Sequence, residues 1–214
     1  MKRIGLILIA VLLLAFPLFS QNVSIPDTAF LYALIEEGVD TNGDGEISYS
    51  EAESVTHLDV SGEGITDLSG IEAFVNLGDL TCSNNQLTSL DVTGCASLTR
   101  LSCAGNQLSS LDVSNNTALE GLYCNENQLT TLDVSKNTEL KTLACGKNKL
   151  SNLDISKNIK LFSDMGLWDG RLDLSKMRTL YEVCVWEMPF PPTARNRVDT
   201  KGSPNVIFTT DCMQ

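Results

Sequence analysis

One pattern of 21 residues is written four times in tandem between Leu80 and Ser163, and it constrains the fold more than any other feature of the chain. The copies begin at Leu80, Leu101, Leu122 and Leu143, and the second reads LSCAGNQLSSLDVSNNTALEG. A fixed period in the twenties is typical of solenoids, in which each repeat forms a coil that buries its apolar side only against neighbouring coils. The sequence therefore predicts a stack of coils.

Each copy contains two short extended segments. In 101–103 (LSC) the leucine and the cysteine alternate with a polar residue, which is the period of a strand with one buried face. Half a repeat later the pattern returns as 111–113 (LDV) and its equivalents. Stacking then predicts two parallel ladders with neighbouring strands about 4.8 Å apart. We expect 172–174 (LDL) to continue the second ladder.

Asparagine recurs at both corners of the coil. The first corner carries Asn85, Asn106, Asn127 and Asn148, and the second carries Asn116, Asn137 and Asn158, with Cys95 in the first copy. An amide side chain both donates and accepts, so stacked asparagines can satisfy the turn and the adjacent coil. We interpret them as scaffold.

These copies resemble the leucine-rich repeats of secreted bacterial proteins, close to short variants in Bacteroidetes surface proteins with the pattern LxCxxNQLTxLDVSxNTxL. Residues 98–108 keep the spacing LxxLxCxxNxL, and residues 55–79 look like an internalin-type first repeat. The resemblance implies an α/β-type leucine-rich-repeat solenoid with a parallel β ladder and capped ends. It also implies recognition of another protein.

The chain divides into a signal peptide (1–20), an N-terminal helical cap (21–57), leucine-rich repeats (58–179) and a C-terminal cap (180–214). The signal peptide is indicated by Lys2 and Arg3 before an apolar run at 4–16, which is too short for a good membrane span. A retained N-terminal anchor is the alternative. We expect cleavage near Ser20 and a secreted or cell-surface protein.

The charge balance excludes some partners. Loss of the signal peptide would change the net charge from −12 to −14, because it removes two basic residues and no acidic ones. Nucleic acid and anionic lipid are bound by basic patches. A cationic partner or calcium is a better match.

Residues 40–51 (DTNGDGEISYSE) satisfy the twelve-residue EF-hand calcium loop. That loop takes side-chain oxygens at positions 1, 3, 5, 9 and 12 and a backbone carbonyl at 7, with a glycine at 6 for the sharp turn. The predicted ligands are Asp40, Asn42, Asp44, Glu46, Ser48 and Glu51. The alternative is an acidic turn without metal.

The single loop affects its predicted role. Calcium sensors open a groove through a pair of such loops, whereas this sequence contains a single loop. A single extracellular loop favours a structural site with an affinity of about 10⁻⁵ to 10⁻³ M. A helix at 27–37, with Asp27 as N-cap, precedes the loop, so calcium would stiffen a cap over the first coil.

Seven cysteines are present in a chain that we expect to be exported. Cys82, Cys103, Cys124 and Cys145 occupy inward positions and point the same way up the stack, which is poor geometry for a disulfide or a zinc site. We expect them to be buried thiols. Cys184 and Cys212 remain as the predicted disulfide, with Cys95 left single.

One aspartate per coil forms an outward column on the second ladder. Its members are Asp91, Asp112, Asp133, Asp154 and Asp173. Neighbouring like charges should raise one another's pKa slightly. The column is either a solvated edge, balanced by neighbouring lysines, or an array that holds cations or a basic partner.

The sequence contains no histidine paired with a nucleophile and no Gly-rich phosphate loop, so we expect no enzyme. We expect a binding module for another protein or a surface glycan, or alternatively a calcium-stabilised envelope protein without a discrete ligand. The binding face should be the outward side of the first ladder, which lines the concave surface in solenoids of this kind. Its candidate residues are Thr81, Ser83, Ser102, Tyr123, Asn125 and Glu126, with Tyr123 as the exposed aromatic anchor.

Overall fold

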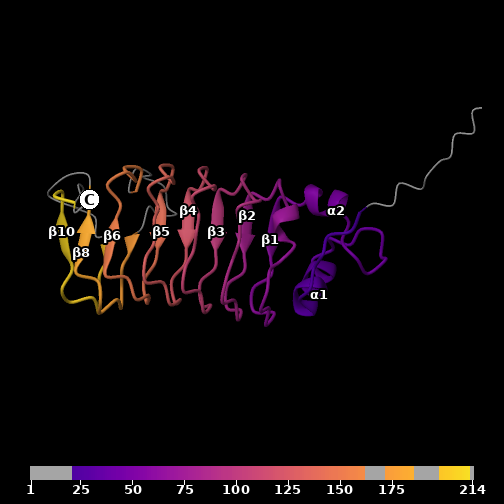
Figure 1. Ribbon diagram of the computed structural model, residues 1–214, viewed down its shortest axis with the longest axis horizontal. Coiled ribbons are helices and arrows are strands. Elements are labelled where there is room, and N and C mark those ends of the chain that lie inside the picture. The colour runs from indigo at the N-terminus through magenta and orange to yellow at the C-terminus, as the bar shows by residue number, and fades with distance from the viewer. Residues whose placement is uncertain (1–20, 162–171, 186–197, 213–214) are drawn as a thin grey trace, which may run out of the picture.

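The computed structural model describes residues 21–161, 172–185 and 198–212, and within them the chain forms a parallel-stranded solenoid. Figure 1 shows the coils stacked along the long axis, with the helices at the N-terminal end. The predicted signal peptide lies outside the described residues. None of the described helices has the length and apolar character needed to span a membrane.

The first side of each coil contributes one strand to a seven-stranded parallel sheet. Its strands, in spatial order, are β1 (His57–Asp59), β2 (Asp79–Thr81), β3 (Arg100–Ser102), β4 (Gly121–Tyr123), β5 (Thr142–Ala144), β7 (Leu172–Asp173) and β9 (Val198–Asp199). The inward leucines stack in register, for example Leu101 on Leu122 and Leu122 on Leu143. This confirms the predicted first ladder.

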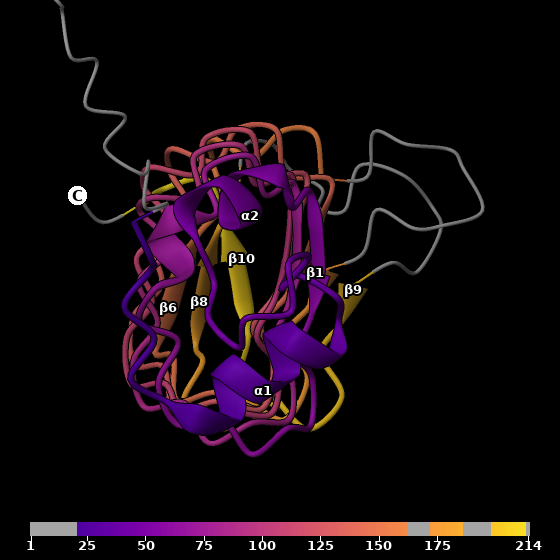
Figure 2. The same ribbon diagram turned by 90° about the vertical axis from the view of Figure 1, so that its right-hand side faces the viewer.

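The second side of the coil forms a ladder only towards the C-terminus. There β6 (Asn152–Asp154), β8 (Glu182–Cys184) and β10 (Ile207–Thr209) make a three-stranded parallel sheet, whereas 90–92, 111–113 and 132–134 form no strands. Figure 2, viewed along the stack, shows this second sheet facing the first across the coil interior. The predicted second ladder is therefore wrong for the earlier copies.

The assignment of 172–174 to the second ladder is also wrong. Strand β7 pairs with β5, with Leu172 beside Leu143 and Asp173 beside Ala144. The segment contains the LD pair of the second side, but its inward Leu172 and Leu174 replace Leu143 and Cys145 of the first. Asp173 consequently does not belong to the aspartate column.

The coils continue beyond residue 179, where the sequence analysis placed the start of a C-terminal cap. Strand β8 pairs with both β6 and β10, and β9 pairs with β7. Val183 is fully buried and Phe208 is partly buried against the core, at the inward positions that leucine occupies earlier. The second side of one coil, formed by β8, and one further coil, formed by β9 and β10, therefore occupy much of the segment assigned to the cap.

The N-terminal cap covers the first coil. It contains α1 (Thr28–Glu36) and α2 (Tyr49–Ser54), and the 3₁₀ helix η1 (Ile71–Ala73) lies in the first coil beyond them. Phe30 and Leu34 of α1 and Phe74 of that coil are fully buried in one core. Figure 2 shows α1 crossing the end of the stack, so the cap shields the terminal coil from water.

The first-corner asparagines join successive coils. Asn127 Nδ2 donates to the carbonyls of Cys103 and Cys124 at 2.9 and 3.1 Å, and its Oδ1 accepts from Leu108 N at 3.0 Å. Asn85, Asn106 and Asn148 make the same set of bonds. The amide thus replaces ladder bonds where the chain turns.

Candidate functional site

The loop at 40–51 is built from side-chain oxygens that accept hydrogen bonds from its own backbone. Asp40 accepts from Gly43 N and Gly45 N, Asn42 from Asp44 N, and Asp44 from Glu46 N, at 2.7 to 2.9 Å. Gly45 has φ +82°, the left-handed conformation needed for the sharp turn. These bonds hold the predicted ligand side chains around one turn of chain.

Glu51 is the most constrained of the predicted ligands. Its side chain accepts from Thr41 N, Thr41 Oγ1 and Ser48 N at 2.8 to 2.9 Å, and it completes a capping box with Ser48 at the start of α2. The residue is only 6% exposed. Hydrogen bonds, first of all from Ser48 N, lower the pKa of Glu51 to about 2, so the carboxylate is charged at neutral pH.

The donor set of the loop fits calcium, a hard cation that takes six to eight oxygen ligands. Among the described residues, however, three potential metal-ligand atoms of Asp, Glu, Cys or His come within 4.8 Å of one another at Asp154, Cys184 and Cys212, and not in the loop. The loop carboxylates form no such group, and those of Asp40, Asp44 and Glu51 accept hydrogen bonds from backbone N–H groups. To bind calcium, Glu51 would have to exchange its capping-box bonds for the metal.

The first-sheet face is the outward surface of β2 to β5 and of the residues that follow each strand. It consists of Asp79, Thr81, Ser83, Arg100, Ser102, Ala104, Gly121, Tyr123, Asn125, Thr142, Ala144 and Gly146. Thr81, Ser102 and Asn125 are partly exposed, as predicted for a binding face, but Ser83 is buried. Ser83 Oγ and Ser102 Oγ lie 2.8 Å apart and share a hydrogen bond.

Tyr123 is less exposed than expected, and Glu126 is paired. Tyr123 is partly buried rather than fully exposed, because its ring lies back along β4 against Gly121. Glu126 is exposed but forms an ion pair with Lys147 at 2.6 Å. The charge at this rim of the face is therefore balanced.

The aspartate column lies on the second side of the coil. Asp91, Asp112 and Asp133 have a lowered pKa, because Thr93, Ser114 and Ser135 respectively donate hydrogen bonds to them. The prediction of a slightly raised pKa is wrong for these three, since local hydrogen bonds outweigh repulsion between coils. The carboxylates stay charged without any bound cation.

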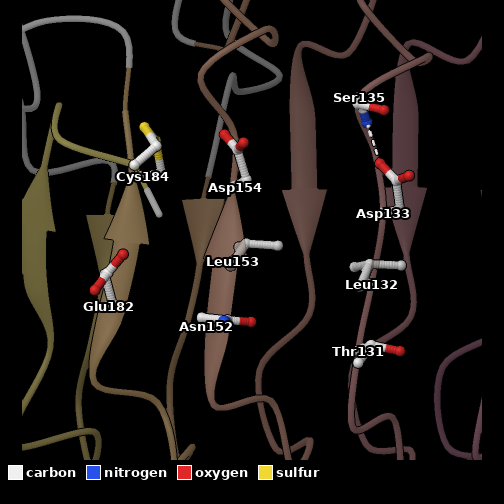
Figure 3. Close-up of a pocket in the computed structure, with 10 residues that line it drawn as sticks. Thr131, Leu132, Asp133, Ser135, Asn152, Leu153, Asp154, Glu182 and Cys184 are labelled. Atoms are coloured by element: carbon white, nitrogen blue, oxygen red, sulfur yellow. Dashed lines mark hydrogen bonds between the residues drawn. A yellow bond between two sulfur atoms is a disulfide. The ribbon is translucent and has the colours of Figure 1, made fainter. Parts of the chain in front are cut away.

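A shallow hollow of about 440 Å³ lies at the C-terminal end of this side. Figure 3 shows Asp133, Asp154 and Glu182 on its walls, with Cys184 level with Asp154 on the adjacent strand. Cys184 is bonded to Cys212 in a disulfide, so the two sulfurs that lie near Asp154 are bonded to one another rather than available to a metal.

The remaining described cysteines are buried thiols. Cys82, Cys103, Cys124 and Cys145 are fully buried and free, as is Cys95. Burial raises the pKa of Cys103 and Cys145 to about 12, so these thiols are protonated and unreactive in the folded chain.

Two features of these surfaces were missed by sequence reasoning. Asp27 caps α1, as predicted, but its second oxygen also binds Thr66 and Asp67 of the first coil. Gly121 lies against the edge of the Tyr123 ring. An i, i+2 spacing of glycine and tyrosine in one strand is the only sequence signal for the second feature.

No family model and no curated protein matches the chain. Among solved structures, the functional domain of InlJ from Listeria monocytogenes, described as including a cysteine ladder, is similar over 88% of this chain and 46% of that one, with 27% identity and a TM-score of 0.64. The internalin InlF of the same organism is similar over 75% of this chain and 57% of its own, with 22% identity and a TM-score of 0.53. The chain thus spans about half of each structure, and both share its leucine-rich-repeat fold.

Proposed function

We propose that the chain is a secreted or cell-surface binding module that recognises another protein or a surface glycan through its first-sheet face. The observation that carries this proposal is the face itself, whose outward residues are mostly small and surround a single aromatic ring. Such a surface admits a partner close to the backbone, and interface energy concentrates in aromatic residues. The similarity to a solenoid described as the functional domain of InlJ supports a functional role for the coils.

The test is capture of a ligand by the purified chain, with variants on the two sides of the coil. Tyr123→Ala should weaken binding by about 2 kcal/mol, whereas Asp112→Ala on the second side should change it little. Both variants should fold and melt only slightly below the wild type, since Tyr123 is partly buried against Gly121 and Asp112 accepts from Ser114 N. The reverse ranking would move the binding surface to the aspartate column and favour a cation array or a basic partner.

We also propose one structural calcium ion per chain at the loop. Asp40, Asn42, Asp44, Ser48 and Glu51 would supply side-chain oxygens, and Glu46 its carbonyl. The support is the complete oxygen donor set together with Gly45 in the left-handed region and Ile47 buried in the core. Bound calcium would neutralise the carboxylates and stiffen the cap. Calorimetry should detect one ion, and no uptake at millimolar calcium contradicts the site.

A calcium-stabilised envelope protein without a discrete ligand is the second candidate. Its support is that six of the twelve residues of the first-sheet face are serine, threonine or alanine. Capture experiments with and without calcium separate the two functions, because only the binding module retains a partner. Mass spectrometry of exported protein beginning near Gln21 would support secretion, and an intact N-terminus in cytosolic protein contradicts it.

A further inference from the structure

The N-terminal segment, residues 21–25, pairs with the loop at 40–51 as a short antiparallel strand. Val23 N donates to Ile47 O at 2.7 Å, and Tyr49 N donates to Gln21 O at 3.0 Å. Ile47 and Tyr49 occupy positions 8 and 10 of the twelve-residue calcium loop. The segment therefore holds the backbone of the second half of the loop.

The same segment contacts two of the proposed calcium ligands. Asn22 forms the antiparallel bridge with Ser48, and its side-chain amide donates to the carboxylate of Glu46. In a loop of this kind the backbone carbonyl at Glu46 and a side-chain oxygen at Ser48 face the ion. Hydrogen bonds on either side of these two positions limit how far their oxygens can move.

The segment also packs on the first coil at Gly70. Val23 is buried in the core, and Ile25 packs against that core. A Cβ built on Gly70 would lie 2.9 Å from Ile25 Cγ1, 3.0 Å from Ser24 O and 3.1 Å from Val23 Cγ1. Glycine therefore allows the close approach, and the segment contacts both the coil and the loop.

The segment begins where the predicted signal peptide ends. Cleavage near Ser20 leaves Gln21 and Val23 in the mature chain, whereas cleavage after Val23 removes the whole paired stretch. The sequence contains a single calcium loop, so the strand partner of this loop comes from the N-terminal segment and not from a second loop.

We infer that residues 21–25 are a structural part of the calcium site, and that the point of signal-peptide cleavage sets the calcium affinity of the mature chain. The inference rests on the proposed calcium site, whose regulation it names. If the docked segment favours calcium binding, calcium favours docking by the same factor, because such coupling is reciprocal. Coupling between linked sites is typically about 5- to 150-fold.

The experiment compares two mature chains, one beginning at Gln21 and one beginning at Ser24, each titrated with calcium in a calorimeter. The chain from Gln21 should bind one ion. The shorter chain should bind it about fivefold or more weakly, because it lacks the backbone hydrogen bonds to Ile47 and Tyr49. Circular dichroism in chelator checks that the shorter chain folds.

Two glycine variants test the same coupling without shortening the chain. Gly70 has φ +104° and Gly62 has φ +79°, so alanine strains the backbone at both positions. The Cβ at Gly62 would meet nothing within 4 Å, whereas the Cβ at Gly70 would push on the segment. Gly70→Ala should therefore weaken calcium binding about fivefold. Gly62→Ala is the matched control and should bind calcium like the wild type.

Hydrogen exchange in the chain from Gln21 supplies the reciprocal measurement. Saturating calcium should slow exchange at Val23 N and Tyr49 N by about the factor that separates the calcium affinities of the two chains. The amides of β3 and β4 should keep their exchange rates, because each coil contacts only its neighbours.

Equal calcium affinities of the two chains overturn the inference while the calcium site stands. The same holds for equal affinities of Gly70→Ala and Gly62→Ala, and this glycine pair decides if the shorter chain does not fold. Absence of calcium uptake by the chain from Gln21 overturns both the calcium site and the inference.

Discussion

Asp27 and Thr66, which are 39 residues apart in the chain, join the N-terminal cap to the first coil. Asp27 Oδ2 accepts from Thr66 N at 2.8 Å and from Thr66 Oγ1 at 2.7 Å. Its other oxygen, Oδ1, accepts from Ala29 N and Phe30 N at the start of α1. A single carboxylate therefore caps a helix and fixes that helix to the solenoid.

Replacing this carboxylate should weaken the docking of the cap. Asp27→Ala removes the N-cap of α1 and leaves the backbone N–H of Thr66 without its acceptor, so the free energy of unfolding should fall by about 2 kcal/mol. Denaturant unfolding measures the change. Thr66→Val is the matched variant, since it removes only the hydroxyl and should cost about 1 kcal/mol. Equal losses in the two variants would contradict the double role of Asp27.

The contribution of Asp27 should depend on pH. Burial raises the pKa of Asp27, but the hydrogen bonds from Thr66, Phe30 and Asp67 outweigh it and lower the pKa to about 2 from an ordinary value of 3.8. A carboxyl with a lowered folded pKa stabilises the fold fully above its unfolded pKa and loses that effect as the pH falls through the folded value. The stability difference between wild type and Asp27→Asn should therefore be constant above pH 3.8 and shrink towards pH 2. A difference that grows on acidification contradicts this assignment.

Glu51 combines a structural role with the proposed calcium-binding role, and a comparison with Asp44 separates the two. Glu51→Gln should weaken calcium binding, and it should also lower the melting temperature in chelator, because the carboxylate caps α2 and accepts from Thr41. Asp44 is exposed and bonds only within the loop, so Asp44→Asn should weaken calcium binding with little effect in chelator. Calorimetry and thermal melts with and without calcium check both. Identical behaviour of the two variants in chelator would refute the structural role of Glu51.

The two asparagine corners should differ in their effect on stability. Asn127→Ala leaves Leu108 N without an acceptor, while the carbonyls of Cys103 and Cys124 keep bonds from Asn106 and Asn148. Asn137 donates to Val113 and Asn116, whose carbonyls also accept backbone N–H groups, and its own Oδ1 is buried without a partner. Asn127→Ala should therefore cost about 1 to 3 kcal/mol more than Asn137→Ala in denaturant unfolding. Equal costs would show that the orphaned N–H finds another partner.

The repeat was sufficient to predict the coil, because its spacing fixes which residues face inward. Leu101, Cys103 and Asn106 lie where the period places them, and the same holds for their equivalents. The prediction from this spacing fails where the repeats lose the 21-residue pattern. The LD pair marks the second side in the four copies but stands on the first side at Leu58, so only the pairing of β7 with β5 settles the place of Leu172.

The contacts between distant segments could not be predicted in the same way. The hydrogen bond from Thr66 to Asp27 depends on how the cap packs on the first coil, and the repeat pattern does not specify that packing. Likewise, the orientation of Tyr123 depends on free space at Gly121. The lowered pKa of Asp112 follows from a local turn at Ser114, whereas the sequence suggested only repulsion along the column.

The disulfide should stabilise one end of the solenoid. Cys184 of β8 is bonded to Cys212, which follows β10, across a sequence separation of 28. In the chain-entropy model a loop of this length contributes about 3 to 4 kcal/mol. Because each coil contacts only its neighbours, replacing both cysteines by alanine should release the last coils without unfolding the first ones. Hydrogen exchange should show lost protection in β8 and β10 and unchanged protection in β3 and β4.

Cys95→Ala is the control for this experiment, because Cys95 is buried and free. It should lower stability through the small cavity that it leaves, and its effect on hydrogen exchange should centre on the corner next to Ile71, whose carbonyl accepts from Cys95 Sγ. Loss of protection spread evenly over all coils in the double alanine variant would mean that the stack unfolds as one unit. An unchanged exchange pattern at β8 and β10 would mean that the disulfide does not hold the terminal coils.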